Sequence, residues 1–240
     1  MKDLLRTGVP GLDEVFRGGI LPNSCVLVTG APGTGKSIIG LQFIIQGAKD
    51  GEPGLYITSE EPAATLRVYA SKLGLDLEEW EKKGLITIYE QPIIGKILSI
   101  EAPLHLIKEK KIKRLVLDSL TLFEYAYSHD NDQYEFRKGV LSFIADMKGE
   151  GVTMFATSER KTTDIDLFTF QDQDFLFEGV IILSRIRKGA SFERVLTVAK
   201  MRGQDHALDI FPLTLGKGGA KVLTKQLPFS LIEKEAPARF

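Results

Sequence analysis

The chain has 240 residues, of which 43% are apolar, and it carries 31 Lys plus Arg against 32 Asp plus Glu. This balance excludes a global electrostatic attraction to nucleic acid or to anionic membranes, although local charged patches remain open. No apolar run approaches the roughly 18 residues that a membrane span needs, and the amino-terminal residues lack the apolar segment of a signal peptide. We therefore expect a soluble, cytoplasmic protein with a sizeable core.

Strand-like and helix-like segments alternate through the first two thirds of the chain. Short runs of apolar and β-branched residues predict strands at Ser24–Thr29, Leu55–Thr58, Leu85–Tyr89, Arg114–Leu117 and Val152–Ala156. Helical periodicity predicts helices at Ser37–Lys49, Pro62–Leu73, Ile100–Lys111 and Asp132–Lys148. Short apolar strands separated by helices are typical of a parallel sheet covered on both faces. The single cysteine, Cys25, lies in the first strand and is expected to be a buried small residue.

The last third of the chain is strand-rich, with only glycine-containing turns between the strands. The strands are predicted at Gly179–Leu183, Arg194–Ala199, Leu208–Leu213 and Lys221–Thr224. We predict one domain over residues 1–226, an α/β fold with a mainly parallel central sheet flanked by helices and extended by carboxyl-terminal antiparallel strands. Residues 227–240 form a tail that is either loose or docked on a partner.

Residues 30–37 match the pattern G-x-x-x-x-G-K-[ST] at every position, between a predicted strand and a predicted helix. Glycines let the backbone wrap around phosphates, and the exposed N–H groups and the helix start stabilise the negative charge. In this pattern the lysine reaches the β- and γ-phosphates and the hydroxyl binds Mg²⁺. We predict that the chain binds ATP or ADP with Mg²⁺. The predicted nucleotide-binding residues of this segment are Gly30, Ala31, Pro32, Gly33, Thr34, Gly35, Lys36, Ser37 and Ile38.

The metal also needs a carboxylate at the end of a neighbouring strand, to hold its water shell. Asp118 fits this role, because it ends the apolar run Arg114–Leu117. The alternative role for Asp118 is to cap the segment that follows. We predict that Ser37 and Asp118 form the metal side of the site.

Hydrolysis needs a carboxylate that orients or deprotonates the attacking water. Glu60 and Glu61 lie just past the strand Leu55–Thr58, which we expect beside the strand of the phosphate loop. Two adjacent acids at that point can face the γ-phosphate. By spacing alone they equally suit the start of the next helix, where the dipole favours acids.

Several spaced motifs together resemble the KaiC-like branch of the RecA/RadA-type ATPases, over roughly residues 5–225. They are Thr7–Asp13 followed by Gly18-Gly19-Ile20, the pair Glu60-Glu61, the segment Thr157–Arg160, and Lys200-Met201-Arg202-Gly203 with His206. The resemblance implies a RecA-like fold and a homohexameric ring that binds ATP between neighbouring subunits. It also implies that Glu60 and Glu61 are catalytic.

The resemblance further suggests that Lys200 and Arg202 reach the γ-phosphate held by the adjacent subunit, as catalytic and nucleotide-binding residues. Residues two apart on a strand share a face, so the two cations could meet one anion. A strand edge protected by charges remains the alternative. His206 is a third residue that could touch the nucleotide of the neighbour.

Two departures from the clock protein of this family bear on function. That protein has two fused copies of the domain, and this chain has one. The stretch Gln171–Gly179, where we would place the autophosphorylated pair of the clock protein, contains no Ser or Thr. This absence speaks against self-phosphorylation and timekeeping.

The stretches that would correspond to the DNA-binding loops of RecA-type recombinases are acidic. Glu124–Phe136 and Thr162–Gly179 together hold nine acids and no Lys or Arg. Because DNA affinity depends on cations that neutralise phosphates, we expect no DNA binding.

Three functions remain open at this point. The favoured one is a Mg²⁺-dependent, homohexameric ATPase whose nucleotide state regulates an unidentified protein partner. The alternatives are a RadA-like accessory ATPase of DNA recombination or repair, and an ATP-binding scaffold with little turnover.

Overall fold

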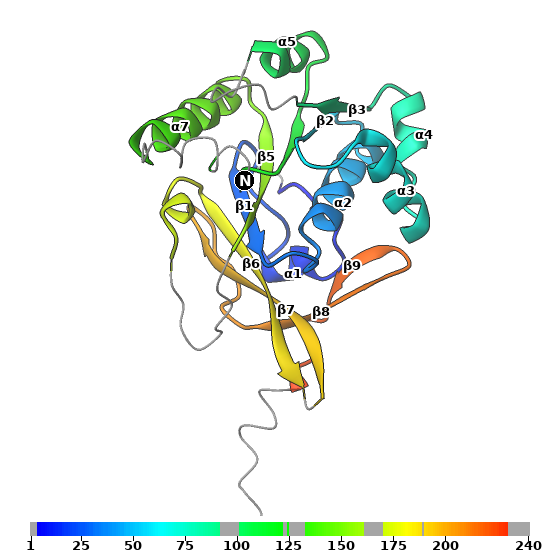
Figure 1. Ribbon diagram of the computed structural model, residues 1–240, viewed down its shortest axis with the longest axis vertical. Coiled ribbons are helices and arrows are strands. Elements are labelled where there is room, and N and C mark those ends of the chain that lie inside the picture. Colours follow the sequence, from blue (N-terminus) through cyan, green and yellow to red (C-terminus); the bar gives the residue numbers. More distant parts are fainter. Residues whose placement is uncertain are drawn as a thin grey trace, which may run out of the picture.

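The computed structural model describes residues 4–91, 101–121, 124, 133–160, 170–188 and 190–229. In these ranges the strands form one nine-stranded sheet, in the order β3-β2-β4-β5-β1-β6-β7-β8-β9 (Figure 1). The parallel part consists of β1 (Cys25–Gly30), β2 (Gly54–Thr58), β3 (Ile86–Glu90), β4 (Arg114–Asp118), β5 (Thr153–Glu159) and β6 (Gly179–Lys188). The antiparallel extension, from β6 onward, adds β7 (Ser191–Met201), β8 (Phe211–Gly216) and β9 (Gly219–Val222).

Helices cover both faces of this sheet, as the sequence predicted (Figure 1). They are α1 (Leu12–Val15), α2 (Lys36–Lys49), α3 (Ala63–Leu73), α4 (Leu77–Lys82), α5 (Glu101–Glu109) and α7 (Gln133–Gly149), with a short 3₁₀ turn, η1, at Asp172–Phe175. Successive residues of a strand face opposite sides, so the continuous apolar runs fill two cores. Val26 and Val28 belong to the core under α2, and Cys25 and Leu27 belong to the core under α7. The α/β fold class with a carboxyl-terminal antiparallel extension is thus confirmed.

Two glycines allow α2 to pack closely on the sheet. A Cβ added at Gly40 would lie 2.9 Å from Cγ1 of Val116, and one added at Gly47 would lie 2.4 Å from Cδ of Arg114. Contacts below about 3 Å are too close for a real Cβ, so larger residues would push the helix outward. The close fit holds the first turn of α2 near the carboxyl ends of the parallel strands.

Three sequence expectations about the strands were wrong. The strand β2 was expected beside β1, but β4 and β5 lie between them. A helical connection lets a parallel strand enter the sheet several positions away, so sequence neighbours need not pair. The strand expected at Leu208–Leu213 is instead Phe211–Gly216, because pairing begins where Phe211 meets Leu196 of β7. The strand expected at Lys221–Thr224 begins earlier, because the tight turn pairs Gly216 with Gly219.

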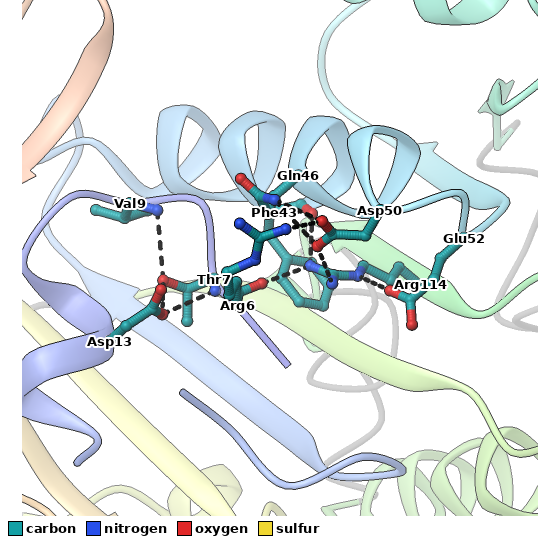
Figure 2. A network of polar contacts seen from close by, with 9 residues as sticks. All are labelled: Arg6, Thr7, Val9, Asp13, Phe43, Gln46, Asp50, Glu52 and Arg114. Carbon is teal, nitrogen blue, oxygen red and sulfur yellow. Dashed lines mark hydrogen bonds and ion pairs between the residues drawn. The ribbon is translucent and has the colours of Figure 1, made fainter. Parts of the chain in front are cut away.

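A polar network around Arg114 ties the amino-terminal segment to α2 and β4 (Figure 2). The Arg114 side chain is only 1% exposed, and its Nε donates to Oε2 of Glu52 at 2.6 Å. Its Nη1 donates to the carbonyl oxygens of Arg6, at 2.6 Å, and Phe43, at 3.3 Å, while the guanidinium lies over the Phe43 ring. The buried cation therefore has partners on three segments of the chain, at the opposite ends of the strands from the phosphate loop.

The Cys25 thiol is expected to be inert in the folded protein. Burial, followed by the charge of Glu178, raises the pKa of this thiol from 9.0 to about 12. Since the thiolate is the nucleophile, iodoacetamide at pH 8 should label the native protein at least a hundredfold more slowly than the urea-unfolded chain, as followed by intact mass. The raised pKa also means that the folded state binds this proton more tightly. The contribution of Cys25 to stability is therefore complete below pH 9 and is lost as the pH rises towards 12. Equal labelling of native and unfolded chains would contradict the burial.

Candidate functional site

The phosphate loop joins the carboxyl end of β1 to the amino end of α2. Its turn uses left-handed backbone at Gly33, with φ +72°, and at Gly35, with φ +114°. Residues other than glycine rarely adopt these angles. The first turn of α2 holds no acid, so its N–H groups and its dipole are available to an anion. Residues 30–38 thus form a glycine-rich turn that leads into a helix start, and their role in nucleotide binding stays a prediction.

Lys36 lies inside this loop. Its Nζ donates to the carbonyl oxygens of Gly30, at 3.0 Å, and Ala31, at 3.3 Å. Burial lowers the pKa of the ammonium group, and the charges of Glu159, Asp118 and Glu60 act in the opposite direction. An ammonium held by two backbone carbonyls and surrounded by acids is a cation that a triphosphate can recruit.

The structure adds two arginines to the outer side of the loop. Arg185 on β6 donates from Nη2 to the carbonyl oxygen of Pro32 at 2.8 Å, and Arg194 on β7 donates from Nε to that of Gly33 at 3.3 Å. Sequence reasoning missed both, because the pairing of β6 with β1 was unknown. The available signal was the appearance of arginines in strands that are otherwise mainly apolar.

Asp118 ends β4 and is 8% exposed. The Tyr56 hydroxyl donates to its Oδ2 at 2.5 Å, and the Thr157 hydroxyl donates to its Oδ1. Ser37, the other predicted metal-side residue, comes from the first turn of α2 and lies near the same Tyr56 hydroxyl: burial raises the pKa of Tyr56, and the Ser37 side chain acts in the opposite direction. The structure therefore places both Ser37 and Asp118 near a tyrosine that sequence reasoning did not identify.

These donors suit Mg²⁺. A hydroxyl and a carboxylate are hard oxygen ligands, and Mg²⁺ in phosphate sites keeps waters and phosphate oxygens in its remaining positions. Among the described residues no group of three or more His, Cys, Asp and Glu side chains forms a metal site of its own. Ser37 and Asp118 would accordingly hold the metal together with the nucleotide phosphates.

Glu60 lies next to this cluster. The Ser119 hydroxyl donates to its Oε1, and its charge reaches Lys36. The open alternative was that the acids start the next helix, but the first amide of α3, at Ala63, donates to Glu90 instead, at 2.8 Å. Glu61 is fixed through its backbone, which bonds twice with the Thr58 hydroxyl. The structure thus places the Glu60 carboxylate with Asp118 and Lys36.

Glu159, the last residue of β5, is a further acid at this end of the sheet, and sequence reasoning assigned it no role. It is the acid with the largest effect on Lys36. Its amide donates to the Thr121 hydroxyl at 2.8 Å, which fixes the backbone at the strand end. The motif Thr157–Arg160 was visible in the sequence, but only the adjacency of β5 and β1 reveals that it borders the phosphate loop.

Lys200 and Arg202 lie at the other end of the sheet. On β6, Leu183 pairs with Gly30 of β1, whereas Val180 pairs with Lys200 of β7. Three residues of strand, roughly 10 Å, therefore separate the level of Lys200 from that of the loop. Arg202, whose amide donates to the carbonyl oxygen of Glu178, lies still further away. Within one subunit the structure does not bring these cations to the phosphate loop.

The local arrangement of the two cations differs from the expected one. Arg202 follows the last residue of β7, so the two are not alternate residues of one strand. The pairing register also shifts between Val180 and Ile181, beside Lys200. The two cations are still neighbours. Burial, followed by the positive charge of Arg202, lowers the pKa of Lys200, and an effect of that kind requires the two charges to lie close together. Nη2 of Arg202 donates to the carbonyl oxygen of Phe175 at 3.4 Å, a contact that holds the side chain near η1.

His206 lies in the loop after β7, four residues beyond Arg202 in the sequence. Its Nε2 is buried and has no hydrogen-bond partner among the residues that the structure describes. The loop is anchored nearby, since Gln204 donates to the carbonyl oxygen of Phe16 at 2.6 Å. His206 is thus not near the phosphate loop of its own subunit.

Several predicted features lie outside the described residues. They are residues 125–132 and 162–169 of the two acidic stretches, and the tail from residue 230 onward. In the part of the chain that is described, no helix is long and apolar enough to cross a membrane.

The sheet and its phosphate loop define a P-loop nucleotide-binding domain. The family model described as "ATPase: KaiC" matches residues 5–227, and the chain belongs to this family. The family resemblance inferred from the motifs is thereby confirmed, and with it the ATP-binding P-loop character of the domain.

The relatives include both single-domain and longer proteins. The circadian clock protein KaiC3 of Synechocystis is 30% identical over 96% of this chain and 47% of its own length, so the chain spans about half of that protein. A UPF0273 protein of Pyrococcus furiosus is 29% identical over 90% of this chain and 92% of its own. The crystal structure of a KaiC-like protein from Pyrococcus horikoshii matches with a TM-score of 0.79 and 31% identity, over 92% of this chain and 98% of that one.

Proposed function

We propose that the chain is a Mg²⁺-dependent ATPase that works as a homohexamer, with residues 1–226 as one ATPase domain. Each ATP is bound by the phosphate loop of one subunit and reached by Lys200 and Arg202 of the next. One observation carries the proposal. Lys36, Asp118 and Glu60 converge at one end of the sheet, while the cation pair lies at the other end. A second copy can bring the two halves together.

The chemistry follows from the positions of the side chains. The amides of the phosphate loop and Lys36 hold the phosphates, while Ser37 and Asp118 hold the metal side. When bound, Mg²⁺ neutralises charge on the phosphate oxygens. Glu60, assisted by Glu61, orients the attacking water, and the cations of the neighbour stabilise the charge that develops on the transferred phosphoryl group.

The biological role that we propose is a nucleotide-dependent regulator of a protein partner, as a soluble protein of the cytoplasm. Two features support this role. The acidic stretches of the sequence oppose DNA binding. Leu227, at the start of the tail, is 65% exposed to solvent. Exposed apolar side chains near a terminus suit a docking segment.

Mixing two inactive variants tests the shared site. Arg202→Ala and Glu60→Gln/Glu61→Gln are each expected to lose about a thousandfold in phosphate release, because one lacks the cation and the other the water-orienting acids. In an equimolar mixture about a quarter of the sites pair an intact acid with an intact neighbouring arginine, so activity returns to about a quarter of wild type.

A matched control is the mixture of Arg202→Ala with Lys200→Ala. Both substitutions remove a cation on the donating side, so every mixed site lacks one and no activity should return. Native mass spectrometry would verify that the subunits mix and that ATP favours a sixfold mass. Mixed assemblies that remain as inactive as the separate variants would contradict the shared site.

A further inference from the structure

Tyr56 occupies a buried position between the two metal-side residues. It lies on β2 and is fully buried, in the core cluster beneath α2. Its ring packs against Gly40 of α2, where an added Cβ would lie 3.6 Å from Cε2 of the ring. The phenol thus extends from the sheet towards the first turns of α2, where Ser37 is located.

The hydrogen bond from Tyr56 to Asp118 has a fixed direction. An ionised carboxylate only accepts, so in the 2.5 Å contact Tyr56 donates its single proton to Oδ2 of Asp118. Ser37 is close to the same hydroxyl: burial raises the pKa of Tyr56, and the Ser37 side chain acts on that pKa in the opposite direction.

Asp118 is held from both neighbouring strands. Tyr56 on β2 donates to Oδ2 and Thr157 on β5 donates to Oδ1, and β4 lies between these two strands. One donor on each oxygen fixes the rotation of the carboxylate. Each oxygen retains a second lone pair that can accept from a metal-bound water.

We propose that Tyr56 is a positioning residue of the metal side: its hydroxyl fixes the Asp118 carboxylate, in the neighbourhood of Ser37, for the Mg²⁺ that accompanies the nucleotide. The proposal rests on the proposed function, since it requires that the phosphate loop binds a nucleotide with Mg²⁺. It extends that function to a residue that touches neither the nucleotide nor the metal. Groups that orient metal ligands in this way typically contribute about ten- to a hundredfold to metal affinity.

A purely structural role for Tyr56 makes a different prediction. A buried phenol needs a hydrogen-bond partner, and any acceptor would suffice for stability. Removing the hydroxyl would then change the unfolding midpoint alone. A positioning role instead changes the Mg²⁺ affinity of the nucleotide complex and leaves metal-free nucleotide binding unaltered.

The test is the Mg²⁺ dependence of ADP binding to Tyr56→Phe, measured by isothermal titration calorimetry. Phenylalanine keeps the ring and its packing, so the variant should fold, as thermal unfolding would verify. With EDTA present, ADP affinity should stay within about twofold of wild type. The Mg²⁺ concentration that gives half of the maximal tightening of ADP should rise about tenfold.

Two further variants sharpen the measurement. Tyr89→Phe removes a phenol from the neighbouring strand β3, on the opposite face of the sheet, and should leave the Mg²⁺ dependence unchanged. Thr157→Val removes the other donor to Asp118 and should also raise the Mg²⁺ requirement, because it frees the second oxygen of the same carboxylate. An unchanged Mg²⁺ requirement in Tyr56→Phe overturns the positioning role alone. Absence of ADP binding by the wild-type protein overturns the proposed function as well.

Discussion

Replacing Lys36 with alanine is expected to abolish tight nucleotide binding. The ammonium group of Lys36 donates hydrogen bonds to the carbonyl oxygens of Gly30 and Ala31 within the phosphate loop. Removing one partner of a buried charge pair costs about 2–5 kcal/mol, so the Kd for Mg·ATP should rise about 30-fold or more. Isothermal titration calorimetry of the purified variant would measure this loss.

The free Lys36→Ala protein should nevertheless remain folded. Burial lowers the pKa of Lys36, so the folded state holds this proton less tightly than the unfolded chain does, and carrying the charge at neutral pH costs stability. Lys49→Ala, an exposed substitution in the last turn of the same helix, should keep full affinity. Tight Mg·ATP binding by Lys36→Ala would contradict the assignment of the phosphate loop.

Replacing Arg114 with alanine is expected to cause a large loss of stability. The substitution would leave the carbonyl oxygen of Arg6 without its side-chain donor and Glu52 without its cation, and it would remove one donor from the carbonyl oxygen of Phe43 (Figure 2). Breaking a buried ion pair costs about 3–5 kcal/mol, and the lower end applies because Glu52 is 27% exposed. Urea unfolding followed by circular dichroism would measure the change.

The control for Arg114 is the more exposed pair of Arg67 and Glu81. Arg67 makes two hydrogen bonds to Glu81, but its side chain is 37% exposed. Solvent screens such a pair, so Arg67→Ala should cost no more than about 1 kcal/mol. Equal losses for the two arginine variants would show that burial of Arg114 contributes nothing.

The fold class could be predicted because its signals are local. Continuous apolar runs such as the first strand, Ser24–Thr29, indicate strands covered on both faces, and the helical periods between them indicate crossovers. The order of the strands could not be predicted, since helical connections allow several orders. The expected neighbour of β1 was β2, whereas the sheet places β5 and β6 there.

The same distinction applies to the site. The phosphate loop is one contiguous segment, so its pattern was readable in the sequence. Tyr56 and Asp118 are 62 residues apart, and Arg185 lies 153 residues from Pro32. Contacts of that kind depend on strand order and register. Tyr56 was therefore indistinguishable from an ordinary core residue, although a phenol within an apolar strand needs a buried acceptor.

The separation of the phosphate loop from Lys200 and Arg202 restricts the symmetry of any assembly that shares sites. A contact between these two ends is heterologous, because it joins different surfaces of the two copies. A two-fold dimer could share its sites only if the loop and the cations of one copy lay on a single contact surface, so that each met its counterpart across the axis. Repeating the heterologous contact gives either a closed rotational array or an open helical one. In an open array the subunit at one end has a phosphate loop without neighbouring cations, and the subunit at the other end has cations without a neighbouring phosphate loop. In a closed ring every subunit contributes both its loop and its cations to shared sites.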